Sequence, residues 1–368
     1  MRKALFLEHQ KDFGGGQVVL SKIIKSVSTD LEKIFVIAPR GGNLREKLDE
    51  RFKGRLTFLE LPDFYIKDGK KSLIDYMKII FLNIYAIIFL KYFYSSNFIY
   101  INGLRLIFSG AILSTLCLKK FYMHLHIDHS KLEKLFIIFF SYLPNFKKII
   151  SNSNFIEMRF LKYKKIYFDN SKILTIENCL DDKFENLPFT KRFKNSDFNI
   201  GVFGTLTPDK GQDTVINIAK KFLKLNFFIV GKVGKGREKW FSVLKDSASK
   251  NVKFYPFTDD INQFINKKKI NIIIVPSKWE EPFGLISIES MAASCISILR
   301  NKGGLEEISN NTQALTFKNK KALEQLLSAL LTKSPQDLNE ISENQFNRTK
   351  EKYGSEGFSE KFFKLLID

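Results

Sequence analysis

Short apolar segments alternate with helical patterns along the whole 368-residue chain, and this alternation constrains the fold more than any other feature. It predicts an α/β fold built on parallel sheets. Helical patterns cover residues 17–28 and 71–94, among others. In the first half, the expected strands cover residues 3–8, 33–39, 55–61, 97–102, 120–126, 147–153 and 172–178.

The pattern restarts after a polar stretch that contains Pro188. The later apolar runs are nearly continuous, as is typical of strands buried on both faces. A chain of this length exceeds the size at which one core usually stops growing, so two domains are expected. The second set of expected strands covers residues 198–204, 226–231, 251–257, 270–277 and 295–300.

We therefore expect a Rossmann-like domain over residues 1–187, a second one over 188–350, and a C-terminal helix over 351–368. The sequence leaves open whether that helix crosses back to the first domain. In doubly wound sheets, ligands bind beside the carboxyl ends of the strands. Two such domains facing each other are expected to hold a ligand in the cleft between them.

The formal net charge of +20 favours anionic partners. Residues 1–190 carry +11 (30 basic minus 19 acidic) and the remainder carries +9 (29 minus 20), so neither half is a basic tail. The segment 159–168 interleaves basic and aromatic residues, which suits lipid headgroups or stacked nucleotides, or equally a solvated helix face. No nucleic-acid-binding motif is present, so we expect no nucleic-acid partner and favour an anionic membrane surface.

The cysteines and the longest apolar runs indicate where in the cell the protein is expected. Cys117, Cys179 and Cys295 have neither the spacing of a disulfide framework nor that of metal ligands, and they fit a reducing cytoplasm. The apolar runs 79–90 and 135–146 are shorter than the roughly 18 residues that indicate a membrane span. We expect no spanning segment, and a cytoplasmic protein that is either free or peripheral on the inner face of the membrane.

Glycine-rich turns follow the first strand of each expected domain. In "EHQKDFGGGQ", Gly15 and Gly16 lie in a loop whose backbone can approach a ligand, with an anion held at a helix start at residue 17. In "FGTLTPDKG", Lys210 lies at the end of a strand, where it can neutralise a diphosphate. A tight turn and a solvated lysine are the alternatives for these two loops.

The stretch "PSKWEEPFGLISIESMAA" places a carboxylate, Glu289, beside the apolar stripe of an expected helix. An ionised group in an apolar setting needs partners. We hypothesise that Glu289 accepts hydrogen bonds from two ribose hydroxyls, that Glu281 meets the sugar, and that the amides of Phe283, Gly284 and Leu285 hold sugar or phosphate oxygens. A structural pair with a nearby lysine is the alternative.

These residues resemble the E-x7-E motif of family 4 retaining glycosyltransferases, with Glu281 and Glu289 in the acidic positions. The resemblance implies a GT-B fold of two Rossmann-like domains. It covers most of the chain and extends to the segments "FGGGQ" (13–17), "ISNSNFI" (150–156), "IENCLD" (176–181), "GTLTPDKG" (204–211) and "NKGGLEEI" (301–308).

The resemblance also implies a chemistry. A sugar passes from a nucleotide-sugar donor, such as a UDP-sugar, to a glycan or a lipid-linked acceptor, with retention of configuration and with neither metal nor cofactor. A histidine faces the donor sugar, for which we choose His126 first and His124 second. Where the family has an arginine, this chain has Thr205, so Lys210 must supply that positive contact to the diphosphate.

Three further residues complete the expected site. Asn102 ends a strand of the first domain and is expected on the acceptor side, whereas Tyr255 and Phe257 are expected to flank the base. Polysaccharide biosynthesis at the cell surface, including that of lipopolysaccharide, is the expected process. A nucleotide-sugar 2-epimerase and a non-catalytic nucleotide-sugar-binding protein are the rivals, and the absence of GxGxxG disfavours an oxidoreductase.

Overall fold

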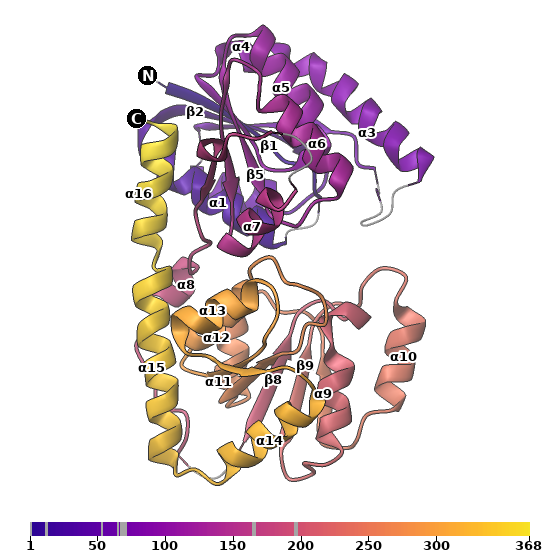
Figure 1. Ribbon diagram of the computed structural model, residues 1–368, viewed down its shortest axis with the longest axis vertical. Coiled ribbons are helices and arrows are strands. Elements are labelled where there is room, and N and C mark those ends of the chain that lie inside the picture. The colour runs from indigo at the N-terminus through magenta and orange to yellow at the C-terminus, as the bar shows by residue number, and fades with distance from the viewer. Residues whose placement is uncertain are drawn as a thin grey trace. The chain divides into compact units, whose positions relative to one another are not determined.

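The computed structural model describes residues 2–11, 14–52, 54–64, 66, 72–163, 167–194 and 198–368. The chain forms two compact units, coloured along the chain in Figure 1. Unit 1 comprises Met1–Glu177 with Glu356–Asp368, and unit 2 comprises Asn178–Ser355. The chain thus returns to unit 1 at its end, and the division falls earlier than the expected boundary at residue 187.

Residues 178–187 belong to unit 2 because they bond to residues at its C-terminal end. The amide of Leu180 donates to the carbonyl of Tyr353 at 2.8 Å, and the amide of Ser355 donates to the Glu185 carboxylate at 2.9 Å. The expected boundary followed the polar composition around Pro188. That composition reflects an exposed connection within unit 2.

Unit 1 contains a parallel sheet in the order β3-β2-β1-β4-β5-β6-β7. The order reverses between β1 and β4, which makes this pair the topological switch point. The expected strands are all present, with bounds shifted at their ends. They are β1 (Arg2–Leu7), β2 (Leu31–Pro39), β3 (Leu56–Leu61), β4 (Phe98–Ile101), β5 (Lys120–Leu125), β6 (Phe146–Ser151) and β7 (Ile173–Thr175).

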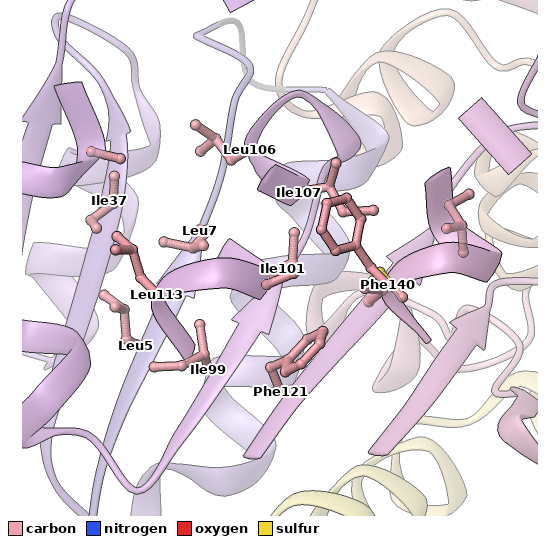
Figure 2. Close-up of a cluster of buried hydrophobic side chains, with 14 of the residues drawn as sticks. Leu5, Leu7, Ile37, Ile99, Ile101, Leu106, Ile107, Leu113, Phe121 and Phe140 are labelled. Atoms are coloured by element: carbon pink, nitrogen blue, oxygen red, sulfur yellow. The ribbon is translucent and has the colours of Figure 1, made fainter. Parts of the chain in front are cut away.

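Helices pack on the sheet of unit 1 through apolar side chains. Figure 2 shows part of this core, in which Leu5, Leu7, Ile99 and Ile101 of the central strands lie with Leu113 of α5. The helices are α1 (Gly15–Val27), α2 (Leu44–Phe52), α3 (Leu73–Tyr85), α4 (Leu90–Ser95), α5 (Ile107–Leu116), α6 (Lys131–Phe140), α7 (Asn154–Leu161) and α16 (Ser355–Leu366).

The segment Leu73–Ser95 joins α3, the 3₁₀ turn η2 (Ala86–Phe89) and α4 into one helical stretch of 23 residues. Ser72 caps it by accepting from the amide of Asp75. By length and composition this stretch is apolar enough to cross a membrane, and 17% of its most apolar window is buried. The expectation of no spanning segment counted only the uninterrupted run 79–90, so its length argument was wrong.

Unit 2 contains a parallel sheet in the order β10-β9-β8-β11-β12-β13. Its switch point lies between β8 and β11. The last strand was not predicted, because three residues carry too little pattern to be recognised. The strands are β8 (Asn199–Phe203), β9 (Asn226–Val230), β10 (Val252–Tyr255), β11 (Ile272–Val275), β12 (Ile296–Arg300) and β13 (Leu315–Phe317).

Helices of unit 2 surround this sheet, and the long α15 contacts α12 and α13 (Figure 1). Near-continuous burial of β11 and β12 agrees with helices on both faces. The helices are α8 (Asp182–Glu185), α9 (Gln212–Ala219), α10 (Glu238–Asp246), α11 (Ile261–Lys267), α12 (Leu285–Ala292), α13 (Gly304–Thr312), α14 (Lys320–Leu331) and α15 (Pro335–Tyr353).

Candidate functional site

The loops that follow β8 and β11 meet at the switch point of unit 2. The first loop passes through the 3₁₀ turn η5 (Pro208–Lys210) into α9, and the second passes from Pro276 to α12. The carbonyl of Asp209 accepts from the amides of Lys278, at 2.7 Å, and Trp279, at 3.3 Å. These bonds fix one loop against the other.

Gly211 allows this close approach. Its φ of 76° lies in the left-handed region, and a Cβ atom there would lie 2.1 Å from the carbonyl oxygen of Pro276. Only glycine satisfies both the conformation and the contact. The position therefore holds Lys210, the preceding residue, over the end of β11.

Lys210 and Glu281 form the polar centre of this site. The Lys210 Nζ donates to Glu281 Oε1 at 2.7 Å, and the Ser277 hydroxyl donates to the same oxygen at 2.5 Å. Glu281 is buried, and the Lys210 ammonium also lies 5.1 Å from the centroid of the Trp279 ring. The sequence predicted both charged residues but missed Ser277, for which only its place at a strand end was a signal.

A glycine pair supports the loop that carries Glu281. A Cβ atom at Gly304 would lie 2.5 Å from the carbonyl oxygen of Pro282. The amide of Gly304 donates to the Glu281 carbonyl at 2.7 Å. Gly303 has a φ of 63°, and a Cβ atom there would lie 3.0 Å from backbone atoms of Glu280. The "GG" of residues 303–304 thus packs the start of α13 against the acidic loop.

Glu289 lies on the second turn of α12 and is half-buried. The helix begins at Leu285, after Gly284 with φ of 105°. The Phe283 side chain is buried, with its ring centroid 5.6 Å from that of Tyr353, so the backbone amide is the part of this residue left for a ligand. In the first turn, the amide of Ser287 already donates to the Gly284 carbonyl.

The remaining donor-side candidates lie on neighbouring strand ends. Thr205 is exposed after β8, and its carbonyl accepts from the buried Gln212 side chain at 2.9 Å. Tyr255, at the end of β10, packs against Phe264 with centroids 5.1 Å apart. Phe257 is 59% exposed. Among the described residues, no hydrogen bond or ring contact joins these two aromatic side chains to Lys210 or Glu281.

In unit 1, a chain of hydrogen bonds links the ends of three adjacent strands. Glu8 follows β1, Asn102 follows β4 and His126 follows β5. The Asn102 Nδ2 donates to Glu8 Oε2 at 2.6 Å, and the His126 Nε2 lies 2.9 Å from Asn102 Oδ1. The sequence predicted Asn102 and His126 but missed Glu8, whose only signal was its position just after a buried strand.

The chain of bonds determines the tautomer of His126. Because the Asn102 amide nitrogen donates to Glu8, its carbonyl oxygen accepts, and the proton must lie on Nε2 of the histidine. Burial and the nearby His129 lower the pKa of His126 to about 3. The ring is therefore neutral near pH 7, with a lone pair on Nδ1.

Glu8 is buried, and its carboxylate is held by several donors. Oε1 accepts from the amides of His9, at 2.7 Å, and Gln10, at 2.8 Å. Burial raises the pKa of Glu8, and the bonds from Gln10, Asn102 and His9 partly oppose that rise. The carboxylate is thus a fixed acceptor at the base of the bond chain.

His124 lies deeper than His126. Its Nδ1 is 2.7 Å from the Tyr100 hydroxyl, and its ring centroid is 4.0 Å from that of His126. Burial holds the pKa of His124 well below its usual range. Of the two candidates, His126 has the partly exposed ring, whereas His124 is 2% exposed.

The glycine loop differs from its expected position. Helix α1 begins at Gly15, not at residue 17, so Gly15 and Gly16 form its first turn. Amides in a first helical turn have no earlier helical carbonyl to bond. Phe13, part of the predicted "FGGGQ" loop, lies outside the described residues, as do residues 164–166 of the basic and aromatic segment 159–168.

Solved structures with both units resemble the chain along its whole length. The Anabaena HepE structure in complex with UDP and glucose matches with a TM-score of 0.80 at 17% identity, over 99% of each chain. The structure of WaaG, a glycosyltransferase involved in lipopolysaccharide biosynthesis, matches with a TM-score of 0.70 at 13% identity, over 100% of each chain. The chain has the GT-B fold.

Sequence comparison shows that part of this GT-B chain matches a known family. Residues 183–348 match the family "Glycosyl transferases group 1". An uncharacterized 42.6 kDa protein in the cps region of Klebsiella pneumoniae is 30% identical over 114 residues, 31% of this chain and 29% of that protein. An uncharacterized glycosyltransferase of Methanocaldococcus jannaschii is 31% identical over 145 residues, 36% of this chain and 40% of that protein.

The match to each of these two curated relatives spans less than half of the relative's length. The family match falls entirely within unit 2 and includes Lys210, Glu281 and Glu289. The solved structures match both units by fold. The GT-B fold was predicted correctly; the finer assignment to family 4 is a proposal.

Proposed function

We propose that this chain is a family 4 retaining glycosyltransferase that moves a sugar from a nucleotide-sugar to a glycan or a lipid-linked acceptor. The observation that carries the proposal is the bonded pair of Lys210 and Glu281 at the switch point of unit 2, inside the segment that matches group 1 glycosyl transferases. A UDP-sugar is the first donor to test, because HepE was solved with UDP and glucose.

Lys210 is proposed to bind the donor diphosphate. A lysine ammonium has three N–H donors, and the pair with Glu281 uses one of them. The remaining donors suit phosphate oxygens, where the positive charge offsets the charge that develops as the diphosphate departs. The bond to Glu281 and the Trp279 ring hold the ammonium in place, which compensates for Thr205 at the usual arginine position.

The other unit 2 roles follow the same geometry. Glu281 is proposed to contact the sugar, and Glu289 to accept from the ribose hydroxyls. The amides of Phe283, Gly284 and Leu285, at the start of α12, are proposed to bind sugar or phosphate oxygens. Tyr255 and Phe257 are proposed to flank the base of the nucleotide.

In unit 1, His126 is proposed to accept a hydrogen bond from a sugar hydroxyl through Nδ1. A neutral ring with its proton fixed on Nε2 has this one acceptor and no acidic proton to give. Asn102 and His124 are proposed on the acceptor side. Gly15 and Gly16 offer first-turn amides of α1 to the diphosphate.

For the reaction, the acceptor hydroxyl is proposed to attack the anomeric carbon on the face from which the diphosphate leaves, and the leaving phosphate oxygen takes the proton. The bond from the anomeric carbon to the phosphate oxygen breaks as the new glycosidic bond forms. The proposed mechanism uses no metal and no cofactor. The anomeric proton of the product, observed by NMR, reports retention, and an inverted product contradicts the mechanism.

The proposed setting is cell-surface polysaccharide biosynthesis, in the cytoplasm or on the inner face of the membrane. Two relatives support this: a protein in the cps region and WaaG, a glycosyltransferase involved in lipopolysaccharide biosynthesis. Nucleic acid has no part in the proposal.

The test is a screen of UDP-, GDP- and ADP-sugars for protection against thermal unfolding, followed by product analysis with and without glycan acceptors. Transfer of the sugar to an acceptor supports the proposal. A 2-epimerase would convert the donor with no acceptor present, and a binding protein would be stabilised without turnover. Thr205, in the place of an arginine, is the observation that keeps the binding protein as a second candidate.

A further inference from the structure

Unit 1 carries an exposed apolar face along the helical segment Leu73–Ser95. We define this apolar face by Leu73, Met77, Ile80, Ile84, Ile87 and Ile88, which are 50–77% exposed. Their spacing of three and four residues places them along one side of the helix. At 1.5 Å per residue the 23-residue segment is about 34 Å long. An apolar strip of this length needs a partner.

A groove runs beside the apolar face. It has a volume of about 540 Å³ and lies among α3, α5 and α6, and its walls include Ile80, Ile84, Ile112, Leu132 and Phe136. Figure 1 shows α3 on the outer side of α5. The volume is in the range of sites that bind small apolar ligands.

Most polar side chains on the groove wall already have partners within the protein; Arg105, for example, donates to the Ile66 carbonyl at 3.3 Å. The Asn83 Nδ2 donates to the carbonyls of Ile79 and Arg105, and Asn83 Oδ1 accepts from the amide of Ser109. Glu133, also on the wall, is bonded to Ser130 in a capping box. The groove therefore suits a ligand without polar groups, such as an acyl chain.

The charge of this part of the chain identifies the partner. Between residues 72 and 127, Asp75 is the one acidic residue, and it is buried in its capping box, whereas there are five basic residues. Lys91 is exposed, and Lys119 lies 5.4 Å from the ring of Tyr94, itself 72% exposed. Lysines and a tyrosine at the edge of an apolar strip are typical of a membrane–water interface.

We propose that the apolar face lies in the surface of an anionic membrane, with the groove accepting an acyl chain from the leaflet and the lysines contacting lipid headgroups. A second copy of the chain fits less well, because it would place lysine against lysine across the interface. The proposal does not rest on sugar transfer, since lipid binding is measured without donor or acceptor.

The test measures binding of the full chain to vesicles by co-sedimentation, with phosphatidylcholine alone or mixed with phosphatidylglycerol. We expect stronger binding to the anionic vesicles and weakening with salt. Ile80→Gln/Ile84→Gln is expected to reduce binding at least about tenfold, because apolar area is what the interface buries. Leu223→Gln/Val243→Gln, at similarly exposed positions of unit 2, is the matched control and should bind like the wild type.

Lys91→Gln/Lys119→Gln tests the headgroup contact. Each lysine is expected to account for about fivefold in binding to the anionic vesicles and for no change on phosphatidylcholine. Circular dichroism and thermal unfolding establish that every variant is folded. Unchanged binding by Ile80→Gln/Ile84→Gln overturns the proposal, as does no vesicle binding by the wild type. If the wild type does not bind lipid but forms a dimer in light scattering, and Ile80→Gln/Ile84→Gln abolishes that dimer, the apolar face binds a second copy of the chain instead.

Discussion

At the scale of single residues, the structure explains which ring nitrogen of a histidine at a strand end carries the proton. His126 is bonded to Asn102, which is bonded to the buried Glu8. Asn102 has one oxygen and one nitrogen to offer, so the direction of the first bond determines the direction of the second. Glu8 is therefore a positioning residue for His126, acting through Asn102.

Glu8→Gln tests this direction. The new side-chain amide can donate where the carboxylate could only accept, so we expect Asn102 to turn its oxygen towards position 8. Its nitrogen then donates to His126 Nε2, and the histidine proton moves to Nδ1. Nitrogen-15 NMR of the imidazole distinguishes the two tautomers. The same tautomer in the wild type and in Glu8→Gln would contradict the bond chain.

The two neighbouring histidines also predict the dependence of stability on pH. The pKa of His126 is lowered to about 3 from an ordinary value near 6.5, so between these values the unfolded chain binds the proton and the folded chain does not. Stability is therefore lost as the pH falls below about 6.5. Burial lowers the pKa of His124 too, in the same direction.

Thermal unfolding of the wild type and His126→Gln between pH 7 and pH 5 checks this. Because glutamine does not titrate in this range, we expect the variant to lose less stability on acidification than the wild type. Parallel acid dependence in the two proteins would show that His126 is not responsible.

Lys210 and Glu281 allow a second test at this scale. Lys210→Met leaves a buried carboxylate with one hydroxyl partner, and we expect a loss of about 1–3 kcal/mol in the free energy of unfolding. Glu281→Gln removes the same pair, so the double variant should lose less than the sum of the two single losses. Chemical denaturation of all four proteins measures this coupling, and strict additivity would mean that the pair has no energetic weight.

Some of the residues at the two switch points could be predicted from the sequence, and others could not. Lys210, Glu281 and Asn102 lie at switch points because apolar strands are easy to recognise and the residue after each strand is then placed by topology. Glu8 also follows a strand, but the sequence alone does not distinguish a buried carboxylate at this position from one exposed to solvent. Its burial depends on β4 lying beside β1, which is a tertiary pairing.

At the scale of elements, glycines that allow close backbone contact decide how the site loops meet. Gly211→Ala places a Cβ atom against the Pro276 carbonyl and puts alanine at φ of 76°. We expect a loss of at least about 1–3 kcal/mol, from the backbone conformation alone. Gly357→Ala is the control: it lies in α16 with open space around it, and should stabilise by about 0.5–1 kcal/mol. Equal effects of the two substitutions in thermal unfolding would contradict this account.

Element prediction succeeded where patterns were long and failed where a strand was short. The strands up to β12 were predicted because runs of apolar and β-branched residues are a clear signal. β13 has three residues, too few for a recognisable pattern. The helical pattern predicted over 71–94 agrees with the helical segment Leu73–Ser95, although the uninterrupted apolar run 79–90 understated how much of that segment is apolar.

At the scale of the whole molecule, the chain leaves unit 1 after Glu177 and returns to it at Glu356. Helix α16 is part of the core of unit 1: Phe362 is fully buried, with its ring 6.4 Å from that of Tyr100 and 6.2 Å from that of His124. An amphipathic pattern predicted this helix from the sequence but did not indicate which unit it packs on. Which unit it joins depends on tertiary contacts.

Phe362→Ala is therefore expected to destabilise unit 1 by about 3–5 kcal/mol, the usual cost of a large core truncation. Hydrogen exchange followed by mass spectrometry locates the effect, since the two units need not unfold together. Faster exchange should appear in β4 and β5 and not in β8 or β11. Faster exchange confined to unit 2 would contradict the packing of α16 in the core of unit 1.

Titration calorimetry with the donor selected by the thermal screen measures whether the switch point of unit 2 binds a nucleotide-sugar. Lys210→Met is expected to weaken binding at least about tenfold, since an ionic hydrogen bond contributes about 1.5–3 kcal/mol. Lys224→Met, at an exposed lysine of the same unit, should bind like the wild type. Equal donor affinity in Lys210→Met and the wild type would contradict the account.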